Sequence, residues 1–296
     1  MKIGNNSYLC NLNIGIKEVM EERKVLENCL LAAAIGDIAG QPYEFSPNKN
    51  YDEIVLDRDD SWYTDDTVCT FACAEAYIRG LDMAENLKRR CLQESMCGYG
   101  PSFLQWIQAP ELQPPYSSLG NGAAMRCSIA GWAAESEEDA VKIAISTAAP
   151  THNHPEGFKG AQSMAVALFM ARMGHSKDEI CDYILSTYYP EWKEKTYDEV
   201  QVTYKFDVTC QGTCPMAILI FRKSRNFEDS LKLCCCSSGD TDTLGAIVAP
   251  IAYAYYREMP QYLIDNAKKQ LPMWMTRIDK EFYSDVVERT ILPNQC

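Results

Sequence analysis

Two short stretches of this chain place carboxylates and hydroxyls directly before apolar, helix-forming segments: Thr64-Asp65-Asp66-Thr67 and Asp240-Thr241-Asp242-Thr243. Capping a helix needs one such side chain, and the first turn favours further negative charge, but neither effect requires four consecutive oxygen-bearing residues. Carboxylate and hydroxyl oxygens without His or Cys are ligands for Mg²⁺, Mn²⁺ or Ca²⁺ rather than Zn²⁺. We therefore interpret the two stretches as the halves of one site for a pair of cations, about 3.5–4 Å apart.

The spacing within the second stretch excludes two other acidic motifs. An EF-hand loop needs a ligand at its fifth position and a Glu at its twelfth, where this chain has Leu244 and Ile251. An aspartyl phosphotransferase motif would follow an apolar strand, but Ser237-Ser238-Gly239 precedes Asp240. The paired-cation interpretation remains.

Three further stretches combine constrained backbone with polar side chains. Gly120-Asn121-Gly122 leads into a helical segment and leaves backbone N–H groups for phosphate oxygens, although the same residues also form ordinary turns. His154, before the helix-opening Pro155, can donate to an anion or cap the helix. Glu44 follows two glycines and a proline that are expected to close the preceding helix, and its alternative is an exposed loop carboxylate.

The surrounding sequence predicts a mostly helical chain. Capping signals and apolar periodicity indicate helices over residues 24–35, 66–79, 125–134 and 244–256, with another that begins at Pro155 and ends at Gly174. Residues 200–208 alternate apolar and polar side chains, which favours an extended segment. We find no internal repeat or linker and predict a polar extension over residues 1–23, followed by one all-α domain over residues 24–296.

Composition limits the classes of partner and compartment. The 296 residues carry a net charge of -13, which argues against binding to duplex nucleic acid, and we interpret Lys88-Arg89-Arg90 as a solvated helix face. The 14 cysteines include no C-x-x-C pair, so a zinc site is not expected, and free thiols favour a reducing cytosol. The apolar run of residues 29–35 is too short to span a bilayer.

Taken together and in order, five stretches resemble the motifs of the ADP-ribosylglycohydrolase family, which includes dinitrogenase reductase-activating glycohydrolase. They span residues 36–243, about two-thirds of the chain. The matching residues are Gly36-Asp37, Gly40, Pro42, Glu44-Phe45, Thr64-Asp65-Asp66-Thr67, Gly120-Asn121-Gly122-Ala123-Ala124-Met125-Arg126, His152-Asn153-His154-Pro155 and Gly239-Asp240-Thr241-Asp242-Thr243.

The resemblance implies an orthogonal multi-helix, all-α bundle with two Mg²⁺ ions, or Mn²⁺, at the bottom of a cleft. The implied metal ligands are Thr64, Asp65, Asp66, Asp240, Asp242 and Thr243. Thr241 is then a spacer that faces away from the metals. The residues implied to hold ADP-ribose are Gly120, Asn121, Gly122, Met125, Arg126, His154 and Gly157.

The implied activity is hydrolysis of the bond between C1″ of ADP-ribose and a modified protein side chain or related acceptor. Our hypothesis gives the proton transfer to Glu44, Asp66 or Asp240. Two alternatives stay open: a non-catalytic or structural member of the family that binds ADP-ribose, and a two-metal hydrolase of another nucleotide. No membrane partner is expected.

Two features near the second acidic stretch call for separate expectations. Residues 249–257 lack the glycines that the resemblance leads us to expect, and Pro250 should kink or shorten the helix. Cys234, Cys235 and Cys236 lie beside the site, and we favour simple packing over a redox role.

Overall fold

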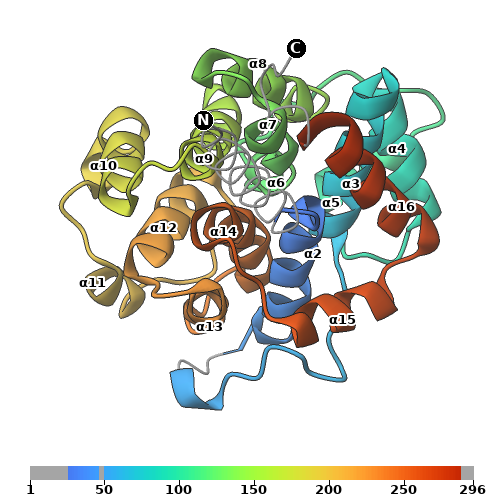
Figure 1. Ribbon diagram of the computed structural model, residues 1–296. Helices are drawn as coiled ribbons and strands as arrows, with labels where there is room; N and C mark the ends of the chain where they lie inside the picture. Colours follow the sequence, from blue (N-terminus) through green and yellow to red (C-terminus); the bar gives the residue numbers. More distant parts are fainter. Residues whose placement is uncertain (1–25, 47–49, 288–296) are drawn as a thin grey trace, which may run out of the picture.

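The computed structural model describes residues 26–46 and 50–287, and every regular element within those ranges is a helix (Figure 1). The all-α fold class is therefore confirmed. The first half contains α2 (Cys29–Gly40), η1 (Gln41–Tyr43), η2 (Tyr51–Glu53), α3 (Asp65–Arg79), α4 (Met83–Gln93), α5 (Pro101–Gln108), α6 (Gly122–Met125), α7 (Ser128–Ala133) and α8 (Glu137–Ala148). The second half contains α9 (Pro155–Arg172), α10 (Lys177–Tyr188), η3 (Pro190–Trp192), α11 (Tyr197–Gln201), α12 (Cys210–Lys223), α13 (Phe227–Cys235), α14 (Thr241–Tyr256), α15 (Gln261–Gln270), α16 (Met273–Phe282) and η4 (Tyr283–Val287).

The predicted polar extension, residues 1–23, lies outside the described residues, so the proposed domain boundary stays a prediction. None of the described helices has both the length and the apolar character needed to cross a membrane.

Helices α2 and α14 lie side by side at the centre of the molecule, and the other helices pack around them (Figure 1). Their backbones are in direct contact. A Cβ atom on Gly36 would stand only 2.0 Å from the Gly245 carbonyl oxygen. A Cβ atom on Gly40 would likewise stand 2.2 Å from the Thr241 carbonyl oxygen. The glycines therefore permit an approach that larger residues would block, and this approach brings the C-terminal half of α2 against the first turn of α14.

The start of α2 is held by a residue distant in the sequence. Its N-cap residue, Asn28, makes no side-chain capping hydrogen bond. Instead, the buried carboxylate of Asp279 in α16 accepts from the backbone N–H groups of Leu30 and Leu31, at 3.1 and 3.2 Å. Burial raises the pKa of Asp279 to about 7. This contact satisfies two helix-end donors and fixes α2 against α16.

Both central helices differ from the sequence prediction at their ends. Helix α2 begins at Cys29 rather than residue 24 and continues through Gly36 to Gly40, because glycine at these positions allows contact with α14. Helix α14 begins three residues earlier than predicted. It also runs through Pro250 to Tyr256, so the expected shortening was wrong. The whole segment around Pro250 is buried, and packing on both sides offsets the missing backbone hydrogen bond.

The predictions for residues 125–134 and 200–208 were wrong in part. The first range forms the end of α6 and all of α7, separated by a turn, rather than one helix. In the second, a capping box between Thr196 and Glu199 starts the short helix α11, which takes in Val200 and Gln201. Only residues 204–208 form an extended loop, and this loop leads to an isolated bridge between Gly120 and Thr209.

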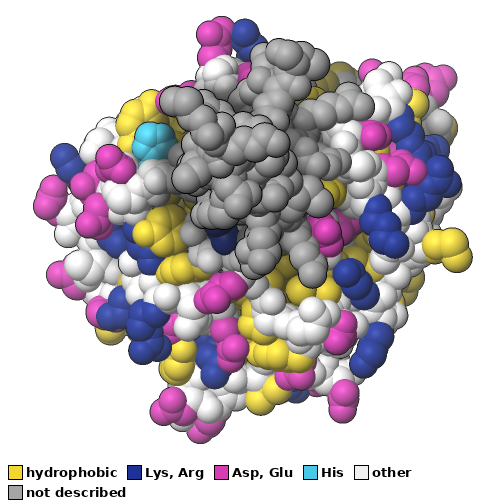
Figure 2. All heavy atoms as spheres, viewed as in Figure 1, with side chains coloured by type: hydrophobic (Ala, Val, Ile, Leu, Met, Phe, Trp, Pro, Cys, Tyr) yellow, Lys and Arg dark blue, Asp and Glu magenta, His cyan; other side chains and the backbone are white. Residues whose placement is uncertain are grey.

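The basic cluster of α4 is only in part the solvated face that the sequence suggested, because Arg89 is exposed but all three side chains have partners. Arg89 and Arg90 form ion pairs with the fully buried Glu75 of α3, and Lys88 donates to the carbonyl oxygens of Ala109 and Glu111. These contacts tie α4 to α3 and to the loop after α5. On the face shown in Figure 2, positive and negative side chains are intermingled. The absence of duplex nucleic-acid binding stays a prediction.

Candidate functional site

The acidic residues of three separate segments meet at the α2–α14 contact. Asp37 lies on α2, Asp65 and Asp66 form the first turn of α3, and Asp240 and Asp242 lie at the start of α14. Thr64 is the N-cap of α3 and accepts from the Asp66 backbone N–H, as the sequence indicated. The structure thus brings the two predicted acidic stretches together, and it adds a fifth aspartate.

Asp37 organises the start of α3. Its carboxylate accepts from the backbone N–H of Thr64 at 2.8 Å and from the Thr64 hydroxyl at 2.9 Å. It also accepts from the backbone N–H and the hydroxyl of Thr67, at 3.2 and 2.5 Å. From the first turn of α14, the Thr243 hydroxyl donates to Asp66 Oδ2 on α3 at 3.2 Å. These hydrogen bonds hold α2, α3 and the start of α14 in fixed positions relative to one another.

Two groups of carboxylates have oxygens close enough to share a cation. Asp37, Asp66 and Asp242 form one group, and Glu44, Asp240 and Asp242 form the other, with the chosen oxygens of each group within 4.8 Å of one another. Asp242 belongs to both groups. Asp66 Oδ1 is buried and has no hydrogen-bond partner. An orphaned buried carboxylate oxygen in an all-oxygen cluster fits a hard divalent cation.

The spacer predicted from the sequence has a definite contact. The Thr241 hydroxyl donates to the Gly40 carbonyl oxygen at 2.8 Å. This side chain therefore joins α14 to α2 and takes no part in the carboxylate cluster.

The carboxylates of the cluster lie so close together that either protonation or a bound cation is favoured. Burial and repulsion between neighbouring carboxylates raise the pKa values of Asp65, Asp66 and Asp242 well above their usual range. Burial raises the pKa of Asp37 to about 6, although the hydrogen bonds from Thr67 and Thr64 oppose the shift. The fully ionised cluster is consequently costly without a compensating positive charge.

We expect divalent cations to stabilise the protein more at about pH 8 than at about pH 5. Carboxylates whose folded-state pKa is raised contribute stability below their unfolded value of about 4, and that stability is lost as the pH rises through the folded-state pKa. For Asp37 this loss is centred near pH 6. Thermal unfolding with Mg²⁺ and with chelator at both pH values measures the difference.

The matched control is the Asp65→Asn/Asp242→Asn variant, which should lose most of both the pH dependence and the cation effect. An equal cation-induced shift of Tm at the two pH values would count against a cation site in this cluster.

Glu44 lies at the C-terminal end of η1, beside the cluster. Burial and repulsion from Asp240 and Asp37 raise its pKa to about 7. The next residue, Phe45, has a positive φ of 28°, a conformation that costs free energy for any residue with a side chain. A carboxyl group that is partly protonated near neutral pH can act as a general acid.

The acidic cluster forms one end of a cavity of about 580 Å³, a volume within the range of small-molecule sites. Its lining includes Thr64, Asp65, Asp66, Asp240, Asp242 and Thr243, together with Glu44. Tyr99, Phe103, Tyr116 and His152 also line it. Aromatic rings of this kind can stack on a nucleobase. Only His152 stands in one of the matching stretches, and the three other rings come from loops and helices without a shared motif.

The glycine-rich loop lines the same cavity. Gly120, Asn121, Gly122 and Met125 all lie in the lining, as the sequence indicated. The Asn121 side-chain amide donates to Asp240 Oδ2 at 2.7 Å and to the Thr213 hydroxyl at 3.1 Å. Asn121 therefore orients an acidic side chain of the cluster, a role that the loop motif alone does not reveal.

His152, rather than His154, is the histidine of the cavity wall. Its Nδ1 atom lies 2.7 Å from the Thr151 hydroxyl and 3.3 Å from Arg126 Nη2. Burial and the Arg126 charge lower the pKa of His152 well below its usual value. Because arginine only donates, Nδ1 of this neutral ring must accept, and the proton is assigned to Nε2, which faces Gly120 and Gly122. His152 can thus donate to a bound anion.

Three predicted substrate-binding residues make structural contacts. His154 is the N-cap of α9 and accepts from the Glu156 backbone N–H, outside the cavity lining. Gly157 also lies outside the lining, and a Cβ atom there would stand 2.8 Å from the Ser118 carbonyl oxygen. Arg126 reaches the cavity wall, but it is buried and donates to Thr147, Ala148 and Thr151. Direct substrate contact by His154, Gly157 and Arg126 stays a prediction.

The cysteines of the region are buried. Cys234, Cys235 and Cys236 are absent from the cavity lining, and Cys235 Sγ contacts the Ala39 carbonyl oxygen at 3.4 Å. Their positions fit the packing role that the sequence favoured.

Comparison with known proteins decides the family. The profile of the ADP-ribosylglycohydrolase family matches residues 20–291. The chain belongs to this family. Membership confirms the resemblance seen in the sequence and supports a hydrolase of ADP-ribose linkages.

Individual relatives agree with this assignment. An uncharacterised protein of Archaeoglobus fulgidus is 24% identical, over 91% of this chain and 96% of its own length. ADP-ribosylhydrolase ARH3 is 27% identical in Mus musculus and 26% identical in Homo sapiens, over 51% of this chain in each case. The match spans about half the length of these two enzymes.

A solved structure shares the fold. The ADP-ribosylglycohydrolase-related protein complex superimposes with a TM-score of 0.72 and 21% sequence identity, over 90% of this chain and 99% of that one. The multi-helix bundle is therefore the family fold. The clustered carboxylates of the described residues are able to bind a metal ion.

Proposed function

We propose that the protein is an ADP-ribosyl-acceptor hydrolase that uses two Mg²⁺ ions, or Mn²⁺, to cleave the C1″ bond between ADP-ribose and a modified protein side chain or related acceptor. The observation that carries this proposal is the convergence of four aspartates at one end of a cavity, with Asp37 close to two of them, the orphaned Asp66 Oδ1 among them and Glu44 beside them. Family membership supplies the reaction class.

The proposed metal ligands are Thr64, Asp65, Asp66, Asp240, Asp242 and Thr243. Asp37 holds Thr64 in place through its hydrogen bonds, and Asn121 orients Asp240. The bound cations would neutralise the carboxylates and orient the hydroxyls of the distal ribose.

The remaining residues have distinct roles. His152 Nε2 and the Gly120–Gly122 loop, which line the cavity, would hold the pyrophosphate, and the rings of Tyr99, Phe103 and Tyr116 would hold adenine. As the C1″ bond to the acceptor breaks, Glu44 gives a proton to the leaving atom; a water molecule then adds its hydroxyl to C1″ and returns its other proton to Glu44. Asp66 and Asp240 remain alternatives for the proton transfer.

Two other functions are less well supported. A non-catalytic or structural relative would not need the acidic residues, yet all six predicted ligands line the cavity. A two-metal hydrolase of another nucleotide would use the same cluster but not require Glu44 beside it. We further propose a cytosolic location, supported by the twelve described cysteines, all of which are free thiols.

The test is a panel of acceptors. Peptides that carry ADP-ribose on arginine or on serine, O-acetyl-ADP-ribose, and ADP-ribose itself are incubated with the protein and Mg²⁺, and the products are analysed by mass spectrometry. We expect ADP-ribose from at least one linked acceptor and no cleavage of the pyrophosphate bond. Pyrophosphate cleavage in place of acceptor release would favour the nucleotide hydrolase.

A further inference from the structure

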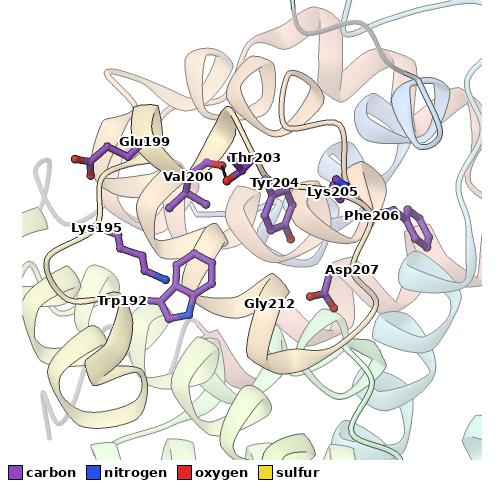
Figure 3. Close-up of a pocket in the computed structure, with 10 residues that line it drawn as sticks. All are labelled: Trp192, Lys195, Glu199, Val200, Thr203, Tyr204, Lys205, Phe206, Asp207 and Gly212. Atoms are coloured by element: carbon purple, nitrogen blue, oxygen red, sulfur yellow. Dashed lines mark hydrogen bonds between the residues drawn. The ribbon is translucent and has the colours of Figure 1, made fainter.

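A second cavity adjoins the first, on the other side of the loop formed by residues 204–208. Its volume is about 650 Å³, and it lies between η3, α11 and the start of α12 (Figure 3). The lining consists of Trp192, Lys195, Glu199, Val200, Thr203, Tyr204, Lys205, Phe206, Asp207 and Gly212. We call this cavity the acceptor groove.

Phe206 connects the groove to the catalytic cavity, because its side chain lines both. Figure 3 shows it at the opposite end of the groove from Trp192 and Lys195. The Phe206 ring lies 5.1 Å from the ring of Phe45, centroid to centroid, and Phe45 directly follows the proposed acid Glu44. Both rings are exposed. The groove therefore leads toward Glu44, the acid of the proposed function.

The loop between the two cavities is anchored to the catalytic residues. Tyr204 packs against Gly239, where an added Cβ atom would stand 2.5 Å from the Tyr204 ring. The Thr213 hydroxyl donates to the Asp207 carbonyl oxygen and accepts from Asn121, which in turn donates to Asp240. A molecule in the groove would thus lie against a wall whose position is fixed relative to Asp240.

The charged side chains of the groove differ in the hydrogen bonds and ion pairs that they already make. Glu199 accepts from the backbone N–H and the hydroxyl of Thr196, and Asp207 accepts from the same two groups of Thr209. Lys195 and Lys205 are exposed, and neither is paired with a carboxylate of the described residues. Lys195 lies over the Trp192 ring at 4.2 Å. Both ammonium groups therefore lack a carboxylate partner and lie beside the apolar side chains of the groove.

We propose that this groove binds the polypeptide that carries the ADP-ribosylated side chain, and that Lys195 and Lys205 select acceptors with acidic residues near the modified position. The inference rests on the proposed function. A polypeptide fits better than nucleic acid, because Trp192, Val200 and Phe206 offer apolar walls and two lysines are few for a phosphate backbone in a chain of net charge -13.

The test compares two peptides with the same ADP-ribosylated residue, one flanked by glutamates and the other by glutamines. At low ionic strength we expect the acidic peptide to show about tenfold higher kcat/KM, since opposite charges accelerate encounter. The Lys195→Glu/Lys205→Glu variant should lose this preference. It should hydrolyse an ADP-ribosylated free amino acid as fast as the parent protein does.

Lys193→Glu is the matched control, because Lys193 is exposed on the same segment but does not line the groove. It should keep the preference for the acidic peptide. An unchanged preference in the double variant would overturn the proposal, and so would an equal loss with the free amino acid. Faster cleavage from an ADP-ribosylated oligonucleotide than from the acidic peptide would also overturn it.

Failure of the proposed function has a different signature, in which the parent protein cleaves none of these substrates. The groove is then tested by fluorescence anisotropy with a labelled, unmodified glutamate-rich peptide. We expect binding that weakens about tenfold in the Lys195→Glu/Lys205→Glu variant but not in Lys193→Glu. Equal binding by all three proteins would contradict the groove proposal.

Discussion

Replacing both Asp65 and Asp242 with alanine is expected to lower the rate of ADP-ribose release by about a thousandfold or more. The two residues come from different helices, so the variant removes a proposed ligand from each half of the cluster. A metal ion that stabilises a transition state contributes several kcal/mol, and each 1.36 kcal/mol is about a factor of ten in rate. Release of ADP-ribose at saturating Mg²⁺ is the measurement.

The control for this variant is Asp57→Ala/Asp59→Ala, in which two exposed carboxylates away from the cavity lining are removed. It should retain full activity. Circular dichroism establishes that both proteins are folded. Full turnover by a folded Asp65→Ala/Asp242→Ala protein would refute the assignment of these aspartates as metal ligands.

Replacing Glu44 with glutamine is expected to lower kcat by about 10²–10⁴-fold, the usual contribution of a general acid. The amide keeps the shape of the side chain but cannot give up a proton in the same way. The loss should shrink for a substrate whose leaving group is already a weak base, such as a nitrophenol, because such a group departs without protonation. Parallel kinetics with a peptide and a nitrophenyl substrate measure this difference.

A ligand role for Glu44 makes the contrasting prediction, since its carboxylate is within reach of Asp240 and Asp242. In that case Glu44→Gln would weaken Mg²⁺ binding and slow both substrates equally. Calorimetric titration of the variant with Mg²⁺ separates the two roles: unchanged affinity supports the acid.

The parts of the site that could be predicted from the sequence are those in which chemistry is concentrated locally. Thr64, Asp65 and Asp66 are consecutive and cap a helix, so their type and spacing already indicated their position. Asp240, Asp242 and Thr243 gave the same signal. That the two stretches meet was a hypothesis from ligand chemistry, and the contact between α2 and α14 explains how they do so.

Asp37 belongs to the first matching stretch but was given no role, because its partners are distant in the sequence. Gly36 and Gly40 were interpreted as the end of a helix, whereas they mark the face on which α2 touches α14. A glycine needed for a turn and a glycine needed for close helix packing look identical in one sequence. The sequence favoured His154 over His152 as a substrate-binding residue for a similar reason. His154 stands next to the helix start, but only the fold shows which ring lines the cavity.

The most direct test of the central claim is a titration of the metal-free protein with Mn²⁺, with ADP-ribose release and bound metal measured on the same samples. We expect no release from the chelator-treated protein, and activity that rises to a plateau as two ions bind per chain. Full turnover by protein that retains less than one divalent ion per chain would contradict a two-cation mechanism.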